Sequence, residues 1–388
     1  DRTGIISLRR TAGCADLALV VRRFRENRFV LMAVIIFFFM SVAAVLGVYE
    51  AMVPLIVFVV PLAHYLGWDS LTGLGMSLLA MAFGFAAAIT NPFTIGVAQR
   101  IAELPLFSGA WLRALFFLLV YACVLFFVRR HALRVERDPR NSPVFTEDQR
   151  YRAELGADSL PPADVMTPAM RHGIIWFGGA MGLAFLFVFV TAGNPVLSDL
   201  AFPLMAVLLL VGGIGAGLLV GMGPAGVARS LTSGAVAMLP GVLLVLMSLS
   251  VRHIVHTGGI TDTILHGAVG VIEGRPPVTA AFLMYAVTLA MNFFVGSASA
   301  KAFLMMPILT PLADLVGITR QTAVLAFGFG DGFSNMLYPT NALLLIGLGF
   351  TVVSYPRWVA WTIGLQAAMF LLSMVFLYIA VTVGYGPF

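Results

Sequence analysis

The sequence predicts an all-α integral membrane protein made of two related halves that face the membrane in opposite directions. Its composition indicates the membrane: 60% of the 388 residues are hydrophobic and 11% are charged, whereas soluble domains carry roughly 25% charge. An internal repeat indicates the two halves. Residues 61–96 and 311–346 align without a gap and share eight identities in 36 positions, where chance gives roughly three. Such an inverted repeat, with helix-breaking polar residues at equivalent places, is typical of secondary transporters.

Three elements are predicted in the first half. Two apolar arms within 29–66 surround a polar tip at Glu50, which predicts a re-entrant helical hairpin. Residues 71–103 are predicted to form a broken transmembrane helix, because Pro92 removes a backbone donor and disfavours helix in the preceding residue. The apolar run 110–128 is long enough to cross the bilayer.

The second half repeats this plan from the opposite face. It begins with three apolar spans, at 173–191, 200–221 and 235–251. A second re-entrant hairpin is expected at 278–315, a second broken helix at 322–353 and a final span at 358–378. Subtracting the 250-residue offset from position 173 gives a negative number, so the chain is expected to lack the start of its first repeat. An inactive truncated protein is therefore one alternative.

The chain thus divides into a first repeat, a polar linker and a second repeat, at 1–128, 129–172 and 173–388. Arginines cluster before the first hairpin and in the linker, so the positive-inside rule places the linker in the cytoplasm of a multi-pass protein of the bacterial inner membrane. The linker contains several prolines and is expected to hold little helix. Its many acidic residues dilute the basic charge and argue against nucleic acid as a partner.

The polar residues at the two breaks are the first candidates for a binding site. Thr90 and Asn91 align with Thr340 and Asn341. Broken helices expose amides and N-termini that suit an anionic solute, and their carbonyl and amide oxygens suit Na⁺. The sequence predicts substrate and Na⁺ contacts here, with Na⁺ at Asn91, Asn341 and Asp331. The alternative is two ordinary polar breaks.

The second half also carries charged residues at membrane depth. Asp331 and Asn335 are four positions apart and share a helix face, and an ionisable residue within a span indicates function. Its alternative is a structural partner for Lys301 or an arginine. Lys301 is the only lysine in the chain and lies at the second hairpin tip, where it occupies a cation site, faces a substrate carboxylate, or snorkels to the interface.

The two tips complete the candidate set. Ser297 and Ser299 flank the second tip, either as ligands or as small residues for helix packing. Glu50 lies at the first tip, either in the site or as a cap. Cys14 and Cys123 are far apart and predict neither a disulfide nor a metal centre. No cofactor is expected beyond Na⁺ or H⁺ as a coupling ion.

One enzymatic alternative remains. The segment Gly328-Phe329-Gly330-Asp331 has the form used by intramembrane aspartic proteases, which need a second carboxylate to share a proton. Asp314 is the nearest other acid in the sequence. We expect a carrier and no enzyme, and finding Asp314 beside Asp331 in the structure would reopen the protease alternative.

Three motifs resemble a known family. Residues 91–99, 296–301 and 317–335 are similar to the YfcC branch of the anaerobic C4-dicarboxylate carrier (DcuC) family, and the resemblance extends over nearly the whole chain. It implies an inner-membrane carrier in the lipid bilayer, with inverted repeats, re-entrant hairpins and a homodimer. The implied partner is a small-molecule substrate, either a C4-dicarboxylate or, by antiport, a basic amino acid such as arginine or ornithine. The main hypothesis is a secondary active transporter that binds its substrate between the hairpin tips and the broken helices.

Overall fold

The computed structural model describes residues 26–155, 168–191, 195–236 and 269–386, with a few single positions between 250 and 267. Helices and turns account for these ranges, and none of the described residues forms a β-strand. The first helices are α3 (Arg28–Leu46), α4 (Ile56–Tyr65), α5 (Ser70–Leu74), α6 (Ala80–Ala87), α7 (Val97–Ile101), α8 (Ala110–Arg137) and α9 (Phe145–Leu155). They are followed by α10 (Pro168–Thr191), α11 (Pro195–Leu219), α14 (Pro277–Phe294), α15 (Ala298–Val316), α16 (Arg320–Gly332), α17 (Ala342–Gly349) and α18 (Tyr355–Thr382).

Six helical segments in the described part of the chain are long and apolar enough to cross a membrane. They are Arg28–Leu46, Ser70–Ile101, Ala110–Arg137, Pro277–Phe294, Ala298–Val316 and Tyr355–Thr382. Large apolar side chains cover their outer faces, as α8 shows with exposed Trp111, Leu118 and Phe126. Such a surface suits the hydrocarbon of a bilayer, so the chain is a multi-pass membrane protein.

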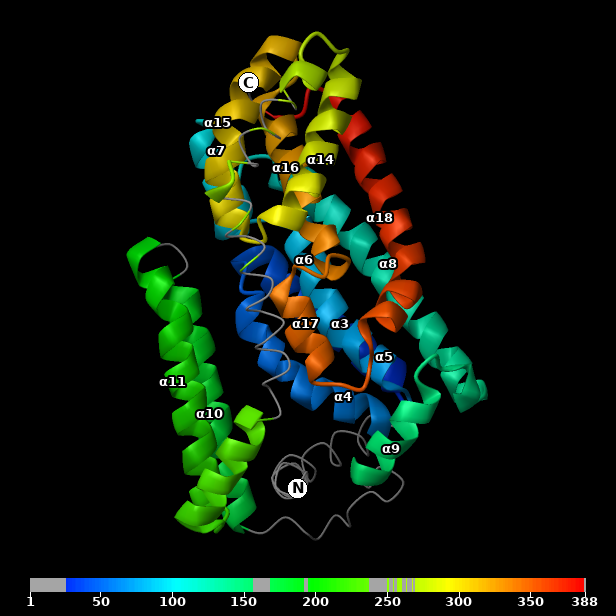
Figure 1. Ribbon diagram of the computed structural model, residues 1–388, viewed down its shortest axis with the longest axis vertical. Coiled ribbons are helices and arrows are strands. Elements are labelled where there is room, and N and C mark those ends of the chain that lie inside the picture. The colour runs from blue at the N-terminus through cyan, green and yellow to red at the C-terminus, as the bar shows by residue number, and fades with distance from the viewer. Residues whose placement is uncertain are drawn as a thin grey trace.

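The centre of the molecule is the crossing of α6 and α16 (Figure 1). Both helices are almost entirely buried, and each packs against an earlier helix of the chain, α6 against α3 and α16 against α14. Glycine permits both approaches: a Cβ on Gly84 would lie 2.2 Å from the Met40 carbonyl oxygen, and one on Gly330 would lie 2.6 Å from Thr288 Cβ. The backbone of α6 therefore lies close to that of α3, and the backbone of α16 lies close to that of α14.

The polar linker contains more helix than its sequence suggests. The span predicted for 110–128 continues to Arg137, and α9 fills Phe145–Leu155. The expectation of little helix is therefore wrong for these residues, because the prolines at 139 and 143 interrupt only the short connection between the two helices. Residues 156–167 lie outside the described part of the chain, as does nearly all of the predicted span 235–251.

A buried polar cluster ties the linker to the start of α5. The Asp69 carboxylate accepts hydrogen bonds from the Thr72 amide (2.9 Å) and hydroxyl (2.6 Å) and from the Ser142 hydroxyl (2.6 Å), and His131 Nε2 lies 2.8 Å away. Burial alone would raise the pKa of Asp69, but the contacts with His131, Ser142 and Thr72 outweigh burial and hold that pKa well below its usual range.

Helices α10 and α11 form a separate antiparallel pair beside this core (Figure 1). They pack mainly against each other. Their apolar contacts with the core include Val48 against Phe187, Leu208 and Leu209, and Phe58 against Phe177 with ring centroids 6.0 Å apart. Among the described side chains, apolar contacts at the turn after α3 and on α4 thus join the pair to the core.

Candidate functional site

Two helices are interrupted at the predicted places. The first stops at Ala87, and Ala88 adopts the left-handed conformation (φ 37°) before the chain resumes at Pro92. The second continues from α16 into a 3-10 turn, η7 (Phe333–Met336), and resumes at Ala342. Both restarts have an asparagine cap. Asn91 Oδ1 accepts from the amides of residues 93 and 94 (2.9 and 3.3 Å), and Asn341 Oδ1 from those of residues 343 and 344 (3.0 and 3.2 Å).

The carbonyl ends of the interruptions are satisfied by the long helix that follows each of them. Arg113 of α8 is buried and donates from Nε (3.1 Å) and Nη2 (3.0 Å) to the Ile89 oxygen. On α18, Trp358 Nε1 donates to the Met336 oxygen (2.9 Å) and the Tyr355 hydroxyl donates to the Leu337 oxygen (2.6 Å). The backbone is therefore irregular here without leaving these acceptors unpaired.

The connection between α3 and the 3-10 turn η2 (Glu50–Leu55) lies against the first interruption. The Thr90 amide donates to the Ala44 oxygen (3.2 Å) and its hydroxyl to the Val45 oxygen (3.1 Å). A Cβ on Gly47 would lie 2.2 Å from Asn91 Oδ1, so only glycine fits at that position. Glu50 itself is exposed and makes no hydrogen bond with Lys301 or Asp331 among the described contacts, but its carboxylate is close enough to Asp331 for the two charges to repel each other.

The connection between α14 and α15 reaches the same interruption from the other side. Ser297 caps α15, since its hydroxyl accepts from the Ala300 amide (3.4 Å). Ser299 donates to the Phe93 oxygen (2.8 Å), which belongs to the restart after the first break. Both predicted tips thus contact the segment around Asn91.

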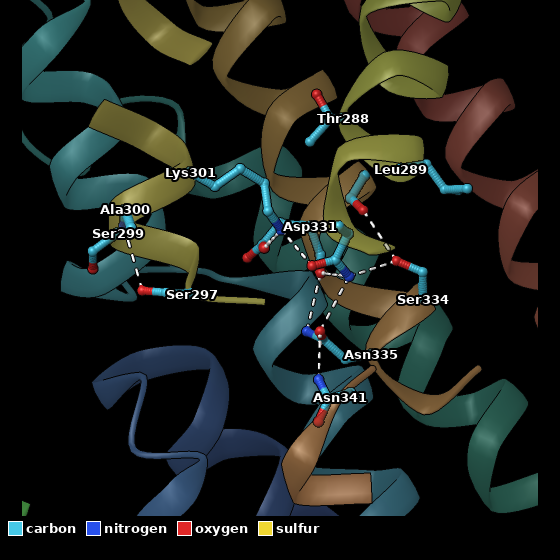
Figure 2. A network of polar contacts seen from close by, with 12 residues as sticks. Thr288, Leu289, Ser297, Ser299, Ala300, Lys301, Asp331, Ser334, Asn335 and Asn341 are labelled. Carbon is cyan, nitrogen blue, oxygen red and sulfur yellow. Dashed lines mark hydrogen bonds and ion pairs between the residues drawn. The ribbon is translucent and has the colours of Figure 1, made fainter. Parts of the chain in front are cut away.

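The predicted charges form one buried pair next to this connection (Figure 2). The Lys301 ammonium in the first turn of α15 lies 2.5 Å from Asp331 Oδ1 and also donates to Asn292 Oδ1. The side chains of Lys301 and Asp331 are 0% and 1% exposed. The structure therefore shows the pairing left open in the sequence, and the interpretation that Lys301 snorkels to an interface is wrong.

This pair retains unused bonding positions. An ammonium has three donors, of which Lys301 uses two in the described contacts, and no described group donates to Asp331 Oδ2. The free side-chain amide of Asn91 is likewise buried without an acceptor among the described residues. Buried polar atoms without partners are costly, so a ligand that supplied an acceptor and a donor would be stabilised here.

Asn292 is the central residue that the sequence analysis missed. Its side-chain nitrogen lies 2.9 Å from the Asp331 backbone oxygen, 2.7 Å from Ser334 Oγ and 3.1 Å from Asn335 Oδ1. Asn335 Oδ1 also accepts from Asn341 Nδ2 (2.8 Å), so one polar chain runs from Lys301 to the second interruption (Figure 2). The signal for Asn292 was a lone amide within an otherwise apolar arm.

The two interruptions lie side by side. A Cβ on Gly332 would lie 2.2 Å from Ala86 Cα, and the rings of Phe83 and Phe333 stack edge to face with centroids 5.0 Å apart. Of the predicted residues, Thr340 is half-buried in the turn before Asn341. The site brings the remaining candidates together, and Glu50, although exposed, acts on Asp331 through its charge.

Asp314, the second carboxylate named in the protease hypothesis, does not lie beside Asp331. Asp314 is exposed and binds Arg320 at 2.8 Å, at the start of α16. Asp331 is eleven residues further along, which is about 16 Å of helix. Asp314 therefore does not share a proton with Asp331, and the aspartic protease alternative loses the second carboxylate that it named.

A family model and two known proteins are similar to this chain in sequence. Residues 4–382 match the family described as C4-dicarboxylate anaerobic carrier (DcuC). A protein of Escherichia coli (strain K12) named "Putative basic amino acid antiporter YfcC" is 33% identical over 394 residues, which cover 98% of this chain and 76% of that protein. An uncharacterized protein of Haemophilus influenzae (strain ATCC 51907 / DSM 11121 / KW20 / Rd) is 26% identical over 373 residues, covering 95% and 71%.

One solved structure is similar in fold alone. The crystal structure of the Alcanivorax borkumensis YdaH transporter aligns with a TM-score of 0.50 at 19% identity, covering 100% of this chain and 85% of that one. Apolar spanning helices, interrupted central helices and these matches define a membrane transporter. The chain belongs to the C4-dicarboxylate anaerobic carrier (DcuC) family, and the resemblance to the YfcC branch is confirmed.

Proposed function

We propose that this protein is a secondary active transporter of small organic solutes in the bacterial inner membrane, driven by an ion gradient or by exchange. The buried Lys301–Asp331 pair beside two interrupted helices is the observation that carries the proposal. Ionisable residues at membrane depth are expensive and mark transport pathways. Paired charges with unused bonding positions are a binding site that only a polar solute would complete.

The inverted repeat with two re-entrant hairpins is part of this proposal. Its support is local: each interrupted helix follows a pair of helices joined by a short turn, α3 and α4 in the first half and α14 and α15 in the second. Each restarts at an asparagine with the same two backbone contacts. The cytoplasmic position of 129–172 and assembly as a homodimer belong to the proposal as well.

The charge pair favours an amino acid over a C4-dicarboxylate. An amino acid offers a carboxylate to the third donor of Lys301 and an ammonium to Asp331 Oδ2, so both unused positions are filled. A dicarboxylate would fill the first position and place a like charge beside Asp331. The name of the Escherichia coli relative agrees with this preference and suggests exchange of basic amino acids. Arginine and ornithine are the basic amino acids that we propose as substrates.

Uptake into proteoliposomes tests the proposal. The purified protein is reconstituted and offered labelled arginine, ornithine, a neutral amino acid, succinate and fumarate, with and without internal substrate and with H⁺ or Na⁺ gradients. We expect saturable amino acid uptake that is stimulated by internal amino acid. Asp331→Ala should abolish it, whereas Asp314→Asn, at an exposed ion pair, should transport normally.

Two results would contradict parts of the proposal. Faster uptake of succinate than of any amino acid would show that the protein is a dicarboxylate transporter. Unchanged amino acid uptake in both Asp331→Ala and Asn91→Ala would remove the site from the pathway.

A further inference from the structure

We infer that the Lys301 ammonium is a resident cation that occupies the place a coupling Na⁺ would take at Asp331 and Asn292. Its nitrogen contacts one carboxylate oxygen and one amide oxygen, and both belong to helices beside the interruption, α16 and α14. Carboxylate and amide oxygens are the ligands that hard metal cations use. The ammonium and a metal ion would compete for the same two atoms.

The other oxygens predicted for Na⁺ are already engaged. Asn91 Oδ1 and Asn341 Oδ1 each accept two backbone amides, and Asn335 Oδ1 faces two amide donors. Donors that point at an oxygen repel a cation that approaches it. Among the described residues, the side-chain amide oxygens of Asn91, Asn335 and Asn341 are therefore already engaged as hydrogen-bond acceptors and do not form a ready Na⁺ site.

The position of Lys301 in its helix indicates that its positive charge serves to neutralise Asp331. The first turn of a helix disfavours positive charge, and Lys301 lies in the first turn of α15, fully buried. All the other basic side chains apart from histidine are arginines. A lysine ammonium is a compact point charge, closer to a metal ion in shape than a guanidinium is.

A cation that is covalently attached has a consequence for coupling. It neutralises Asp331 in every state in which α15 and α16 remain in contact, and it is never released to either side of the membrane. The site would then need no Na⁺ gradient, and exchange or H⁺ would drive transport. This last step rests on the proposed function, whereas the occupancy of the cation position does not.

Thermal unfolding in detergent tests occupancy without any substrate. Melting temperatures are measured in NaCl and in choline chloride at equal ionic strength. The proteins compared are the wild type, Lys301→Ala, Lys301→Arg and the double variant Lys301→Ala/Asp331→Asn. We expect the wild type and Lys301→Arg to be insensitive to Na⁺. Lys301→Ala should melt at least about 3 °C higher in NaCl, and the double variant should lose that rise. Arg320→Ala, at an exposed pair, should resemble the wild type.

The wild type alone can overturn the inference, even if Lys301→Ala does not fold. A Na⁺-dependent rise in the wild type that Asp331→Asn abolishes would show that a metal ion already binds there. A folded Lys301→Ala without any response to Na⁺ would show that the ammonium does not hold a metal position.

The transport assay separates the two proposals. Wild-type uptake that is unaffected by Na⁺, with Lys301→Ala active only in Na⁺, supports both. A Na⁺ shift in melting confined to Lys301→Ala, with no uptake of any solute by the wild type, keeps the resident cation and rejects the proposed transport function.

Discussion

Asn91 and Asn341, 250 positions apart, each accept two backbone amides at the restart of an interrupted helix. The equivalence extends beyond residue identity, because the same oxygen caps the amides two and three residues further on in both places. Their surroundings differ. Asn341 donates to Asn335 in the charged cluster, whereas the side-chain nitrogen of Asn91 has no acceptor among the described residues.

The first prediction concerns these caps. Asn91→Ala and Asn341→Ala should each lower the free energy of unfolding by about 1 kcal/mol, because two amides lose their acceptor. Serine keeps an acceptor oxygen, so Asn91→Ser should recover most of that loss. Thermal unfolding in detergent measures the effect, and equal melting temperatures for Asn91→Ala and Asn91→Ser would contradict it.

The second prediction is a double-mutant cycle on the charged pair. Lys301→Met or Asp331→Leu alone should cost about 3–5 kcal/mol in Na⁺-free buffer, because each leaves a buried charge without its partner. The combination should be more stable than either single variant and should still not transport. For comparison, Asp314→Asn should cost less than about 1 kcal/mol. Additive losses in the cycle would show that the two charges do not interact.

The third prediction is a pH dependence from Asp69. Its pKa is depressed in the folded protein, so its stabilisation is present above the unfolded pKa of about 4 and is lost as the pH falls below it. Asp69→Asn should therefore be about 2 kcal/mol less stable than the wild type at pH 7, and the difference should shrink between pH 4 and pH 3. Melting curves across this range measure it. Asp138→Asn, at an exposed cap, is the control, and a difference that grows on acidification would refute the assignment.

The fourth prediction concerns the crossing of the interrupted helices. Gly332→Ala should cost about 3 kcal/mol, because its Cβ would lie 2.2 Å from Ala86 Cα, where backbone has to move. Gly349→Ala is the matched control, since nothing lies within 4 Å of the added carbon. Expression and melting temperature distinguish them, and equal stability of the two variants would show that the helices separate easily.

Local signals allowed much of the fold to be predicted. A Thr-Asn pair, followed in one half by Pro92, has backbone preferences that end a helix wherever it lies, so both interruptions were predictable. The end of α8 could not be predicted from the sequence. Arginine-rich helix that leaves a bilayer has the same composition as a polar loop, and the predicted boundary at residue 128 falls short of Arg137.

The partners within the site were harder to predict. Lys301 and Asp331 were recognised as charges at membrane depth, but thirty residues separate them and nothing local specifies that they meet. Asn292 was missed because an amide in an apolar arm gives no indication of which way its helix is rotated. Glu50 was predicted at the site because it is a charge at a tip, and its carboxylate does act on Asp331, although it is exposed and makes no described hydrogen bond with the pair.

The contacts of Arg113, Tyr355 and Trp358 limit how this molecule can move. If α6 shifted across the bilayer without α8, the Ile89 oxygen would lose both guanidinium donors. If α16 shifted without α18, the Met336 and Leu337 oxygens would lose their indole and phenol donors. Stranded carbonyls in hydrocarbon are prohibitive. We therefore expect these four helices to move together, and among the described helices the apolar contact of α10 and α11 with the core is a place where movement would break fewer polar contacts.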